Sequence, residues 1–384
     1  MSLAHTRKVV FLTGTRADFG KMKPLIEALN KEKQFNVHIF ATGMHISKRF
    51  GETVNEILKS GFPNVTKFSN GAHKGDAALS LANTVLGFKD YIEKLKPDLI
   101  IIHGDRIEAL AGALVGALTN MRVGHIEGGE ISGTVDEHIR HAVSKLAHLH
   151  FVANKHAKRR LIQLGENASA IFVIGSPDLD IMCAPDALSI GDVKAYYGVP
   201  FEEYGIGVFH PVTTEASELR AHAENFVRAL IRSGRNYVMI YPNNDLGGDI
   251  ILKTYRKKLR GNPHFRLLPS VRFEYFLTLI RHAHCMVGNS SAGVRETPLY
   301  GVPSIDIGSR QHNRLEGKKV PSITHVEYGT DDIVQALTKA FRSKRRFKPK
   351  THFGRGDSTS RFLKLLKGKS IWQVHIQKKF VDAF

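Results

Sequence analysis

Two glycine-bearing segments of the chain could bind anions through backbone amides and nearby side chains. The first is GTRADFG, residues 14–20, which follows an apolar run and opens onto a helical pattern from Lys21. A glycine turn before a helix presents N–H groups and the positive end of the helix dipole, and Arg16 adds a planar cationic group. This segment therefore predicts a phosphate site. Because it lacks the spacing of GxGxxG, it does not favour a nicotinamide dinucleotide.

The second segment is GNSSAGVRETPLYG, residues 288–301, which also follows an apolar run. Its hydroxyls at Ser290 and Ser291 stand at the start of a helical pattern, with Arg295 and Glu296 one turn further on. Such a helix start can hold a diphosphate, whereas the simpler interpretation is a serine that only caps the helix. The glycines on both sides of the serine pair favour the ligand.

Acidic residues follow the apolar runs of the N-terminal half. They are Asp105 in HGDR, Glu127 and Glu130 in HIEGGE, and Asp136 with Glu137 in SGTVDEHIRH. Carboxylates near cationic groups can act as general acid and general base, although any one of them could merely cap a helix. Their common position after strands predicts that they share one edge of a sheet.

The chain has 20 histidines but none of the usual metal-binding spacings. There is no HExxH, and no Cys, His and carboxylate set has zinc spacing, so we expect no metal. His45 in TGMH and His210 in FHPVTT follow apolar runs and are candidates for substrate contacts. Arg106, beside Asp105, is either a second ligand for phosphate or sugar or the partner of its acidic neighbours.

The elements that must position these residues alternate between apolar strands and amphipathic helices. This order occurs in two series, and each series predicts a parallel sheet with helices on both faces. The predicted fold class is therefore α/β with two Rossmann-like domains around a central cleft. The strand-bearing segments are 8–14, 35–43, 96–105 and 122–130, then 205–211, 236–245, 265–271, 285–293 and 302–308. We predict domains at 1–180 and 181–365, with residues 366–384 as a C-terminal helix that crosses back to the first domain.

Composition restricts the class of protein further. The start of the 384-residue chain lacks a signal-peptide pattern, and no apolar stretch is long enough to span a bilayer, so we expect a cytoplasmic protein that does not bind membranes. The two cysteines, Cys183 and Cys285, have no disulfide or metal spacing. The net charge of +19 fits an anionic substrate, and we interpret the basic run at 342–350 as a solvated linker that does not bind nucleic acid.

Taken together, these motifs resemble one enzyme family along nearly the whole chain. GTRADFG, ATGMH, IHGDR, HIEGGEISGTVDEHIRHAVSKLAH, IGSPDLD, FHPVTTE, YPNND, PSVRFEYF, GNSSAGVRE and GSRQHNR are similar, in this order, to segments of the hydrolysing UDP-N-acetylglucosamine 2-epimerases of bacterial sialic-acid synthesis. The resemblance implies a glycosyltransferase-B-like architecture that binds UDP mainly through its second domain. It also implies a homodimer or homotetramer.

Carried over position by position, the resemblance assigns the site residues. In the second domain, the serine pair holds the diphosphate, Glu296 binds the ribose and the Val271 backbone binds uracil. Gly20 replaces a serine of some relatives and offers only its backbone. The substrate contacts implied are Arg16, Gly20 and Arg106 from the first domain and His210, Asn243, Val271, Ser290, Ser291, Glu296 and Arg310 from the second.

The family's reaction explains why carboxylates are needed. A base removes the proton on C2, UDP leaves C1 to give 2-acetamidoglucal, and water adds with inversion at C2 to release N-acetylmannosamine. Asp105, Glu127 and Asp136 match the three acidic positions of the family, one as the base and another as the group that handles water. His210 helps to neutralise the leaving diphosphate. Elimination and hydration involve no net redox change, so we expect no cofactor.

Four other functions remain open at this stage. The same reaction on UDP-2,4-diacetamido-2,4,6-trideoxyglucose, for legionaminic acid, uses most of these motifs. A non-hydrolysing epimerase would retain UDP, although the SGTVDE segment is more similar to the hydrolysing branch. A nucleotide-sugar glycosyltransferase has the same architecture but no use for three acidic positions in the first domain. RNA binding would account only for the charge.

Overall fold

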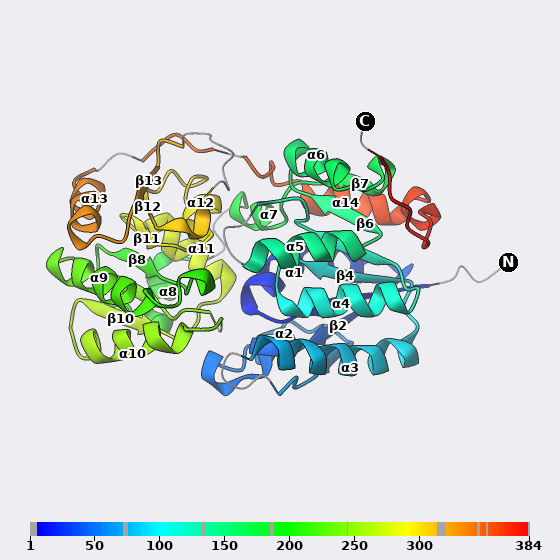
Figure 1. The fold of residues 1–384 in the computed structure, drawn as a ribbon, viewed down its shortest axis with the longest axis horizontal. Helices are drawn as coiled ribbons and strands as arrows, with labels where there is room; N and C mark the ends of the chain where they lie inside the picture. The colour runs from blue at the N-terminus through cyan, green and yellow to red at the C-terminus, as the bar shows by residue number, and fades with distance from the viewer. Residues whose placement is uncertain are drawn as a thin grey trace. The chain divides into compact units, whose positions relative to one another are not determined.

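The computed structural model describes residues 6–71, 76–131, 135–184, 188–243, 245–312, 320–343, 346–350 and 352–382. It divides the chain into two compact units. Unit 1 contains residues 1–130, 136–184 and 352–384, and unit 2 contains residues 131–135 and 185–351. Both are α/β units built on parallel sheets (Figure 1), as the alternation of strand and helix patterns predicted.

Unit 1 is built on a seven-stranded sheet with the order β3-β2-β1-β4-β5-β6-β7. All its strand pairs are parallel. The order reverses between β1 and β4, and open α/β sheets bind ligands outside the carboxyl ends of the strands at such a point. The strands are β1 Arg7–Thr13, β2 Phe35–Ala41, β3 Val65–Lys67, β4 Leu99–His103, β5 Val123–Ile126, β6 Leu149–Val152 and β7 Ile171–Val173.

Helices cover both faces of this sheet because its strands are apolar on both sides. In β1, Val9 and Phe11 pack with α1 and α14, while Val10 and Leu12 pack with α3 and α4 on the opposite face. Figure 1 shows α3 and α4 side by side. The helices are α1 Arg16–Asn30, α2 Val54–Lys59, α3 Ala77–Leu95, α4 Ile107–Leu118, α5 Val135–Leu146, α6 Lys155–Gln163, α7 Asp178–Met182 and α14 Ser358–Lys367, with 3-10 turns η1 Gly43–Ile46, η2 Lys48–Phe50, η3 Ala168–Ala170 and η6 Ser370–Gln373.

Unit 2 repeats this plan with six parallel strands in the order β10-β9-β8-β11-β12-β13. Its order reverses between β8 and β11, and apolar clusters again lie on both faces. The strands are β8 Gly205–Val208, β9 Tyr237–Ile240, β10 Phe265–Leu268, β11 Met286–Gly288, β12 Ser304–Ile307 and β13 Ile323–Val326. The helices are α8 Ile190–Tyr197, α9 Leu219–Arg232, α10 Gly248–Lys258, α11 Phe273–His282, α12 Ala292–Arg295 and α13 Thr330–Arg342, with 3-10 turns η4 Thr213–Glu215 and η5 Ser309–Gln311.

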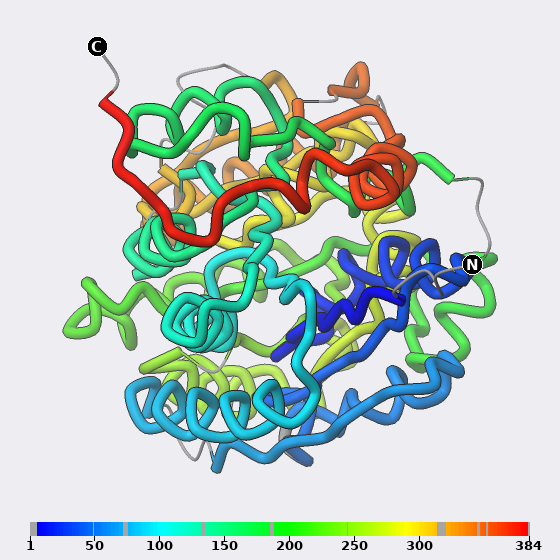
Figure 2. Tube along the Cα trace, turned by 90° about the vertical axis from the view of Figure 1, so that its right-hand side faces the viewer, coloured from blue at the N-terminus to red at the C-terminus, as the bar shows by residue number. Residues whose placement is uncertain are grey.

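The C-terminal segment belongs to unit 1 from residue 352 onward, earlier than the predicted boundary at 365/366. The reason is α14, whose Phe362 packs edge-on against Phe151 of β6 with ring centroids 4.9 Å apart. Beyond it, the predicted C-terminal helix is limited to the 3-10 turn η6, and residues 374–382 run without helix. Figure 2 shows this last segment, in red, crossing the elements of unit 1.

Three further observations concern the predictions made from composition and motifs. Among the helices that the structure describes, none combines the length and apolarity that a membrane crossing requires. Within the basic run, Arg346 donates to the carbonyl of Arg281, while Lys344 and Arg345 lie outside the described residues. Residues 132–134 of the SGTVDE segment also lie outside them.

Candidate functional site

The loop after β1 is organised by a carboxylate that the sequence analysis did not single out. Asp18 accepts hydrogen bonds from the backbone N–H groups of Gly14 and Thr15, both at 3.0 Å, and from the Thr13 hydroxyl at 2.6 Å. Thr15 caps α1 in return, since its hydroxyl accepts from the Asp18 N–H. Two of the amides predicted to face a phosphate are therefore already bonded within the protein.

The side chains of this loop are also held by their neighbours. The Arg16 guanidinium forms an ion pair with Glu56 of α2, and both side chains are largely buried. Gly20 lies inside α1, where it is buried and offers only its backbone. Arg106 stands at the N-terminal boundary of α4, directly after Asp105. Both predicted arginines are thus located at the carboxyl ends of β1 and β4, where the sheet order reverses.

His45 lies beneath the loop and is completely buried. Its Nε2 is 3.0 Å from the Thr13 hydroxyl and its Nδ1 is 2.7 Å from the Thr53 hydroxyl. Because the Thr13 hydroxyl donates to Asp18, it accepts from Nε2–H, and Nδ1 accepts from Thr53. Burial lowers the pKa of His45 to about 4, so the ring is neutral near neutral pH. In this arrangement both ring nitrogens are bonded within unit 1, one to the end of β1 and the other to the start of α2.

Glu127 occupies a constrained position directly after β5. Its φ of 62° lies in the left-handed region, which costs a residue with a Cβ atom of order 1–3 kcal/mol. The surrounding structure imposes this conformation: its N–H donates to the Phe151 carbonyl at 3.1 Å, and its carbonyl accepts from Arg140 at 2.7 Å. A strained backbone at a buried carboxylate is typical of functional sites.

The Glu127 carboxylate is surrounded by groups that can donate or carry a proton. The Ser176 hydroxyl donates to Oε1, Lys21 Nζ lies 3.6 Å from Oε1, and His103 Nε2 lies 3.4 Å from Oε2. Lys21 also lies 3.4 Å from Asp178 at the start of α7. All of these groups are less than a tenth exposed, so their charges interact with little screening by solvent.

Arg140 of α5 connects the loops that follow two neighbouring strands, β4 and β5. One arm of its guanidinium donates to the Glu127 carbonyl, and the other forms an ion pair with the Asp105 carboxylate after β4. Asp136, nearly buried, lies one helical turn before Arg140 on the same face of α5. One buried guanidinium therefore holds the Asp105 carboxylate and the Glu127 backbone, and Asp136 lies on the same face of the helix that carries it.

His125 in β5 fixes the loop that carries Asp105. Its Nε2 lies 2.8 Å from the Gly104 carbonyl, and its Nδ1 lies 3.1 Å from the Ser144 hydroxyl of α5. Burial lowers the pKa of His125 to about 3. The neutral ring donates to the Gly104 carbonyl and links β5, α5 and the loop after β4.

In unit 2, a buried asparagine holds the loop after β8. The Asn289 side chain accepts from the His210 N–H at 2.7 Å and donates to the His210 carbonyl at 2.9 Å. The N–H of Asn243 donates to His210 Nδ1 at 3.0 Å, so the neutral ring carries its proton on Nε2. Three loops, which follow β8, β9 and β11, thereby fix the direction of one imidazole N–H donor.

The remaining predicted residues of unit 2 lie around the ends of β11 and β12. Gly288 has φ 135° and its Cα is pressed against β8, since a Cβ there would stand 1.8 Å from the Val208 carbonyl oxygen. This close approach brings the partly exposed Ser290 and Ser291 to the start of α12. Glu296, at the end of that helix, is buried, and Val271 is buried just before α11.

Arg310 belongs to η5, which is tied back to the rest of unit 2. Arg310 and Gln311 both donate to the Asn289 carbonyl, at 3.4 and 2.9 Å. The Ser309 hydroxyl donates to Glu215, whose other oxygen accepts from the Tyr328 hydroxyl at 2.6 Å. The Asn289 carbonyl, directly before the serine pair in the chain, thus holds Arg310 and Gln311.

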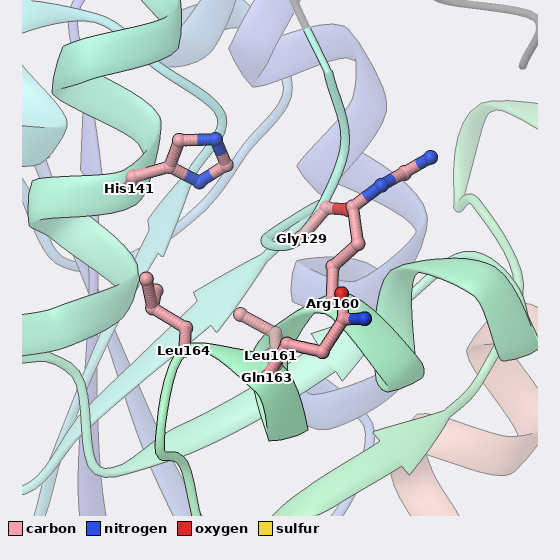
Figure 3. Close-up of a pocket in the computed structure, with 6 residues that line it drawn as sticks. All are labelled: Gly129, His141, Arg160, Leu161, Gln163 and Leu164. Carbon is pink, nitrogen blue, oxygen red and sulfur yellow. The ribbon is translucent and has the colours of Figure 1, made fainter. Parts of the chain in front are cut away.

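A separate cavity of about 250 Å³ lies in unit 1 between α5, α6 and the loop after β5. None of the predicted site residues lines it, and the Arg160 guanidinium points away from it (Figure 3). The lining residues are Gly129, His141, Arg160, Leu161, Gln163 and Leu164.

Sequence reasoning missed several residues that build these sites. In the sequence, Lys21 has the pattern of an ordinary helix residue. The only indication for Ser176 and Asp178 of GSPD is their position after a strand. Asn289 directly precedes Ser290 and Ser291, and the prediction considered only the two serines. Arg140 falls in a helix rich in polar side chains, where nothing in the spacing shows that it is buried.

Two doubly wound units, with carboxylates at the strand ends of one and hydroxyl and cationic groups at those of the other, define a protein of glycosyltransferase-B-like fold. The family model described as UDP-N-acetylglucosamine 2-epimerase matches residues 27–367. The chain belongs to the UDP-N-acetylglucosamine 2-epimerase family.

Individual relatives and structures agree with this assignment. The chain is 47% identical to a UDP-N-acetylglucosamine 2-epimerase of Neisseria meningitidis over 98% of its own length and 99% of the relative's. It is 32% identical to a hydrolysing UDP-N,N'-diacetylbacillosamine 2-epimerase of Legionella pneumophila, over 94% of its own length and 96% of the relative's. In fold it is similar to the Methanocaldococcus jannaschii UDP-GlcNAc 2-epimerase in complex with UDP-GlcNAc and UDP, with a TM-score of 0.77 and 21% identity. The match covers 94% of this chain and 99% of that structure's chain.

Proposed function

We propose that this chain is a hydrolysing UDP-N-acetylglucosamine 2-epimerase that converts UDP-N-acetylglucosamine and water to N-acetylmannosamine and UDP in the cytoplasm, for sialic acid biosynthesis. The observation that carries the proposal is the arrangement around Arg140, which joins Asp105 to Glu127 and has Asp136 one helical turn away. The 47% identity to the Neisseria enzyme supports this substrate. The hydrolysing reaction is favoured by the Legionella relative, which is named as such.

The carboxylates of unit 1 perform both proton transfers of the proposed reaction. One removes the proton on C2 as the C1–O bond breaks, so that the electron pair forms the C1=C2 double bond and UDP leaves. Another activates water, whose oxygen bonds to C1 while a proton returns to C2 from the opposite face. The groups around Glu127, which include Lys21 and His103, keep this carboxylate in a fixed position and can take part in proton movement.

Unit 2 holds the nucleotide and neutralises the leaving group. His210 presents Nε2–H, since its Nδ1 is occupied by the Asn243 N–H, and Arg310 adds a permanent charge. Ser290, Ser291 and the start of α12 bind the diphosphate in this proposal. Charge on the departing UDP is then stabilised by groups that need no reorganisation.

Separate measurement of UDP release and of the sugar product tests the proposal. Without any acceptor, the wild-type chain should release UDP and free N-acetylmannosamine from UDP-N-acetylglucosamine. Asp105→Asn, Glu127→Gln and Asp136→Asn should each lower kcat by about 10²–10⁴-fold, and a variant blocked only in hydration should release UDP with 2-acetamidoglucal. Asp90→Asn, at an exposed carboxylate of α3, is the matched control.

Three results would contradict this proposal. Wild-type rates in all three variants would show that these carboxylates do not perform the chemistry. Accumulation of UDP-N-acetylmannosamine would assign the chain to the non-hydrolysing branch. A need for an acceptor sugar before any UDP is released would indicate a glycosyltransferase.

A second candidate is the same reaction on UDP-2,4-diacetamido-2,4,6-trideoxyglucose in legionaminic acid biosynthesis. It is favoured by the hydrolysing diacetylbacillosamine epimerases of Legionella pneumophila and Campylobacter jejuni, at 32% and 31% identity. The ratio of kcat/KM for the two nucleotide sugars decides between the candidates.

We also propose that the chain works as a homodimer or homotetramer through unit 1. Leu79 and Leu86 of α3 and Leu118 at the end of α4 are 48%, 62% and 79% exposed. Light scattering should give a mass that is a multiple of the chain's, and Leu86→Lys should reduce it. A monomeric wild-type protein would exclude such an assembly.

A further inference from the structure

The paired strands β12 and β13 place three side chains with metal-binding chemistry on one face of the sheet of unit 2. Asp306 and His325 are register partners in this parallel pair, so their side chains point to the same side. Glu327 follows directly after the end of β13, and its Oε1 lies 3.4 Å from His325 Nε2. His312 reaches the same place from η5, which follows β12.

The ligand atoms have the spacing of a coordination polyhedron. His312 Nε2 lies 3.2 Å from His325 Nε2, which in turn lies 3.4 Å from Glu327 Oε1. Ligands about 2.0–2.1 Å from a tetrahedral Zn²⁺ stand about 3.3–3.4 Å from one another. These two distances match this value, and the three ligand atoms all lie within 4.8 Å of one another.

A buried carboxylate orients the central histidine from behind. His325 Nδ1 lies 3.2 Å from Asp306 Oδ2, and Asp306 is only 7% exposed whereas the His325 side chain is 40% exposed. A histidine that binds metal through Nε2 usually donates its Nδ1–H to a carboxylate in this way. The contact with Asp306 therefore leaves the Nε2 lone pair of His325 directed toward His312 and Glu327.

We propose that His312, His325 and Glu327 bind a divalent transition-metal cation of the Zn²⁺ type, with Asp306 as the outer partner of His325. Two imidazoles and one carboxylate suit Zn²⁺, and with three protein ligands the fourth position is left to water. None of these residues belongs to the proposed catalytic or substrate-binding set. The cation is a structural addition to unit 2 and has no part in the elimination chemistry.

Binding of the cation adds a link between two segments that are already joined by backbone pairing of β12 with β13 and by hydrogen bonds through Glu215. Ser309 of η5 and Tyr328, next to Glu327, both donate to the Glu215 carboxylate. A metal bound by His312, which follows η5, and by Glu327, which follows β13, would also join these two segments. Occupancy should therefore raise the thermal stability of unit 2.

The test uses the full chain, stripped with EDTA and titrated with Zn²⁺ alone by calorimetry. The wild-type chain should bind one tight equivalent, which His325→Ala should lose. Glu327→Gln should bind it at least tenfold more weakly, and Asp306→Asn about 10–100-fold more weakly, as expected when an outer carboxylate is removed. Because the Glu327 side chain is 70% exposed, Glu327→Gln keeps the proposal testable even if Asp306→Asn misfolds.

His375→Ala, at an exposed histidine of unit 1, is the matched control and should bind Zn²⁺ as the wild type does. Saturating Zn²⁺ should raise the melting temperature of the wild type and of this control but not that of His325→Ala. The proposal is overturned if the wild type binds no tight equivalent, or if His325→Ala and Glu327→Gln both bind it unchanged.

Discussion

Replacement of Asn289 by alanine tests how unit 2 fixes His210. Asn289 is fully buried and makes two side-chain hydrogen bonds to the backbone of His210, at 2.7 and 2.9 Å. Each buried polar group left without a partner costs about 1–3 kcal/mol, so Asn289→Ala should destabilise unit 2 by roughly 2–6 kcal/mol. Because the imidazole then loses its fixed direction, kcat should fall by about 10–100-fold.

The single tryptophan, Trp372, allows the two units to be followed separately. It lies in unit 1, so urea unfolding followed by its fluorescence should be unchanged, while circular dichroism should show the earlier loss of unit 2. Asn236→Ala is the matched control, because that side chain also makes two hydrogen bonds but near the surface, and it should cost less than about 1 kcal/mol. Equal losses of unfolding free energy in Asn289→Ala and Asn236→Ala would refute the role given to Asn289.

Three further predictions concern unit 1. Arg140→Met should lower kcat about 100-fold and leave UDP affinity unchanged in calorimetry, since Arg140 holds the Asp105 carboxylate and the Glu127 backbone, whereas the proposed UDP site lies in unit 2; an unchanged rate would contradict its positioning role. Lys378→Met should destabilise unit 1 by about 1–2 kcal/mol in fluorescence-monitored unfolding, because Lys378 donates at 2.6 Å to the buried Glu166, which keeps Lys145 and His150 as partners; an unchanged unfolding free energy would contradict this. Burial lowers the pKa values of His125 and His45 to about 3 and about 4, so the unfolded chain takes up more protons below pH 6.5. Stability should therefore be full above pH 6.5 and fall by about 1.4 kcal/mol per pH unit for each histidine as the pH drops toward 4, and a flat profile in urea unfolding would exclude buried neutral rings.

Sequence reasoning was sufficient for the fold because the strands of both units are apolar on both faces. Val9 to Leu12 show why: alternate residues pack into opposite layers, and such a run is typical of a parallel sheet covered by helices. The same reasoning located Asp105 and Glu127 at strand ends. Their relation through Arg140 could not be predicted, because it depends on how α5 packs against the loops after β4 and β5.

Other features escaped prediction for equally local reasons. The segment 14–20 was interpreted as free amides facing a phosphate, but the Asp18 side chain occupies two of them. The C-terminal helix was predicted from apolar content alone, whereas residues 374–382 are held by contacts such as that of Lys378 with the end of α5. The histidine and carboxylate group at β13 has no sequence signature, because its spacing arises from strand register.

The central claim is hydrolytic epimerisation by way of a glycal, and proton NMR in deuterated water tests it most directly. The purified chain is mixed with UDP-N-acetylglucosamine in the presence of EDTA. The products should be UDP and free N-acetylmannosamine that carries deuterium at C2, because the C2 proton is removed and replaced from solvent. Free sugar that retains its C2 proton, or UDP-N-acetylmannosamine as the product, would contradict the claim.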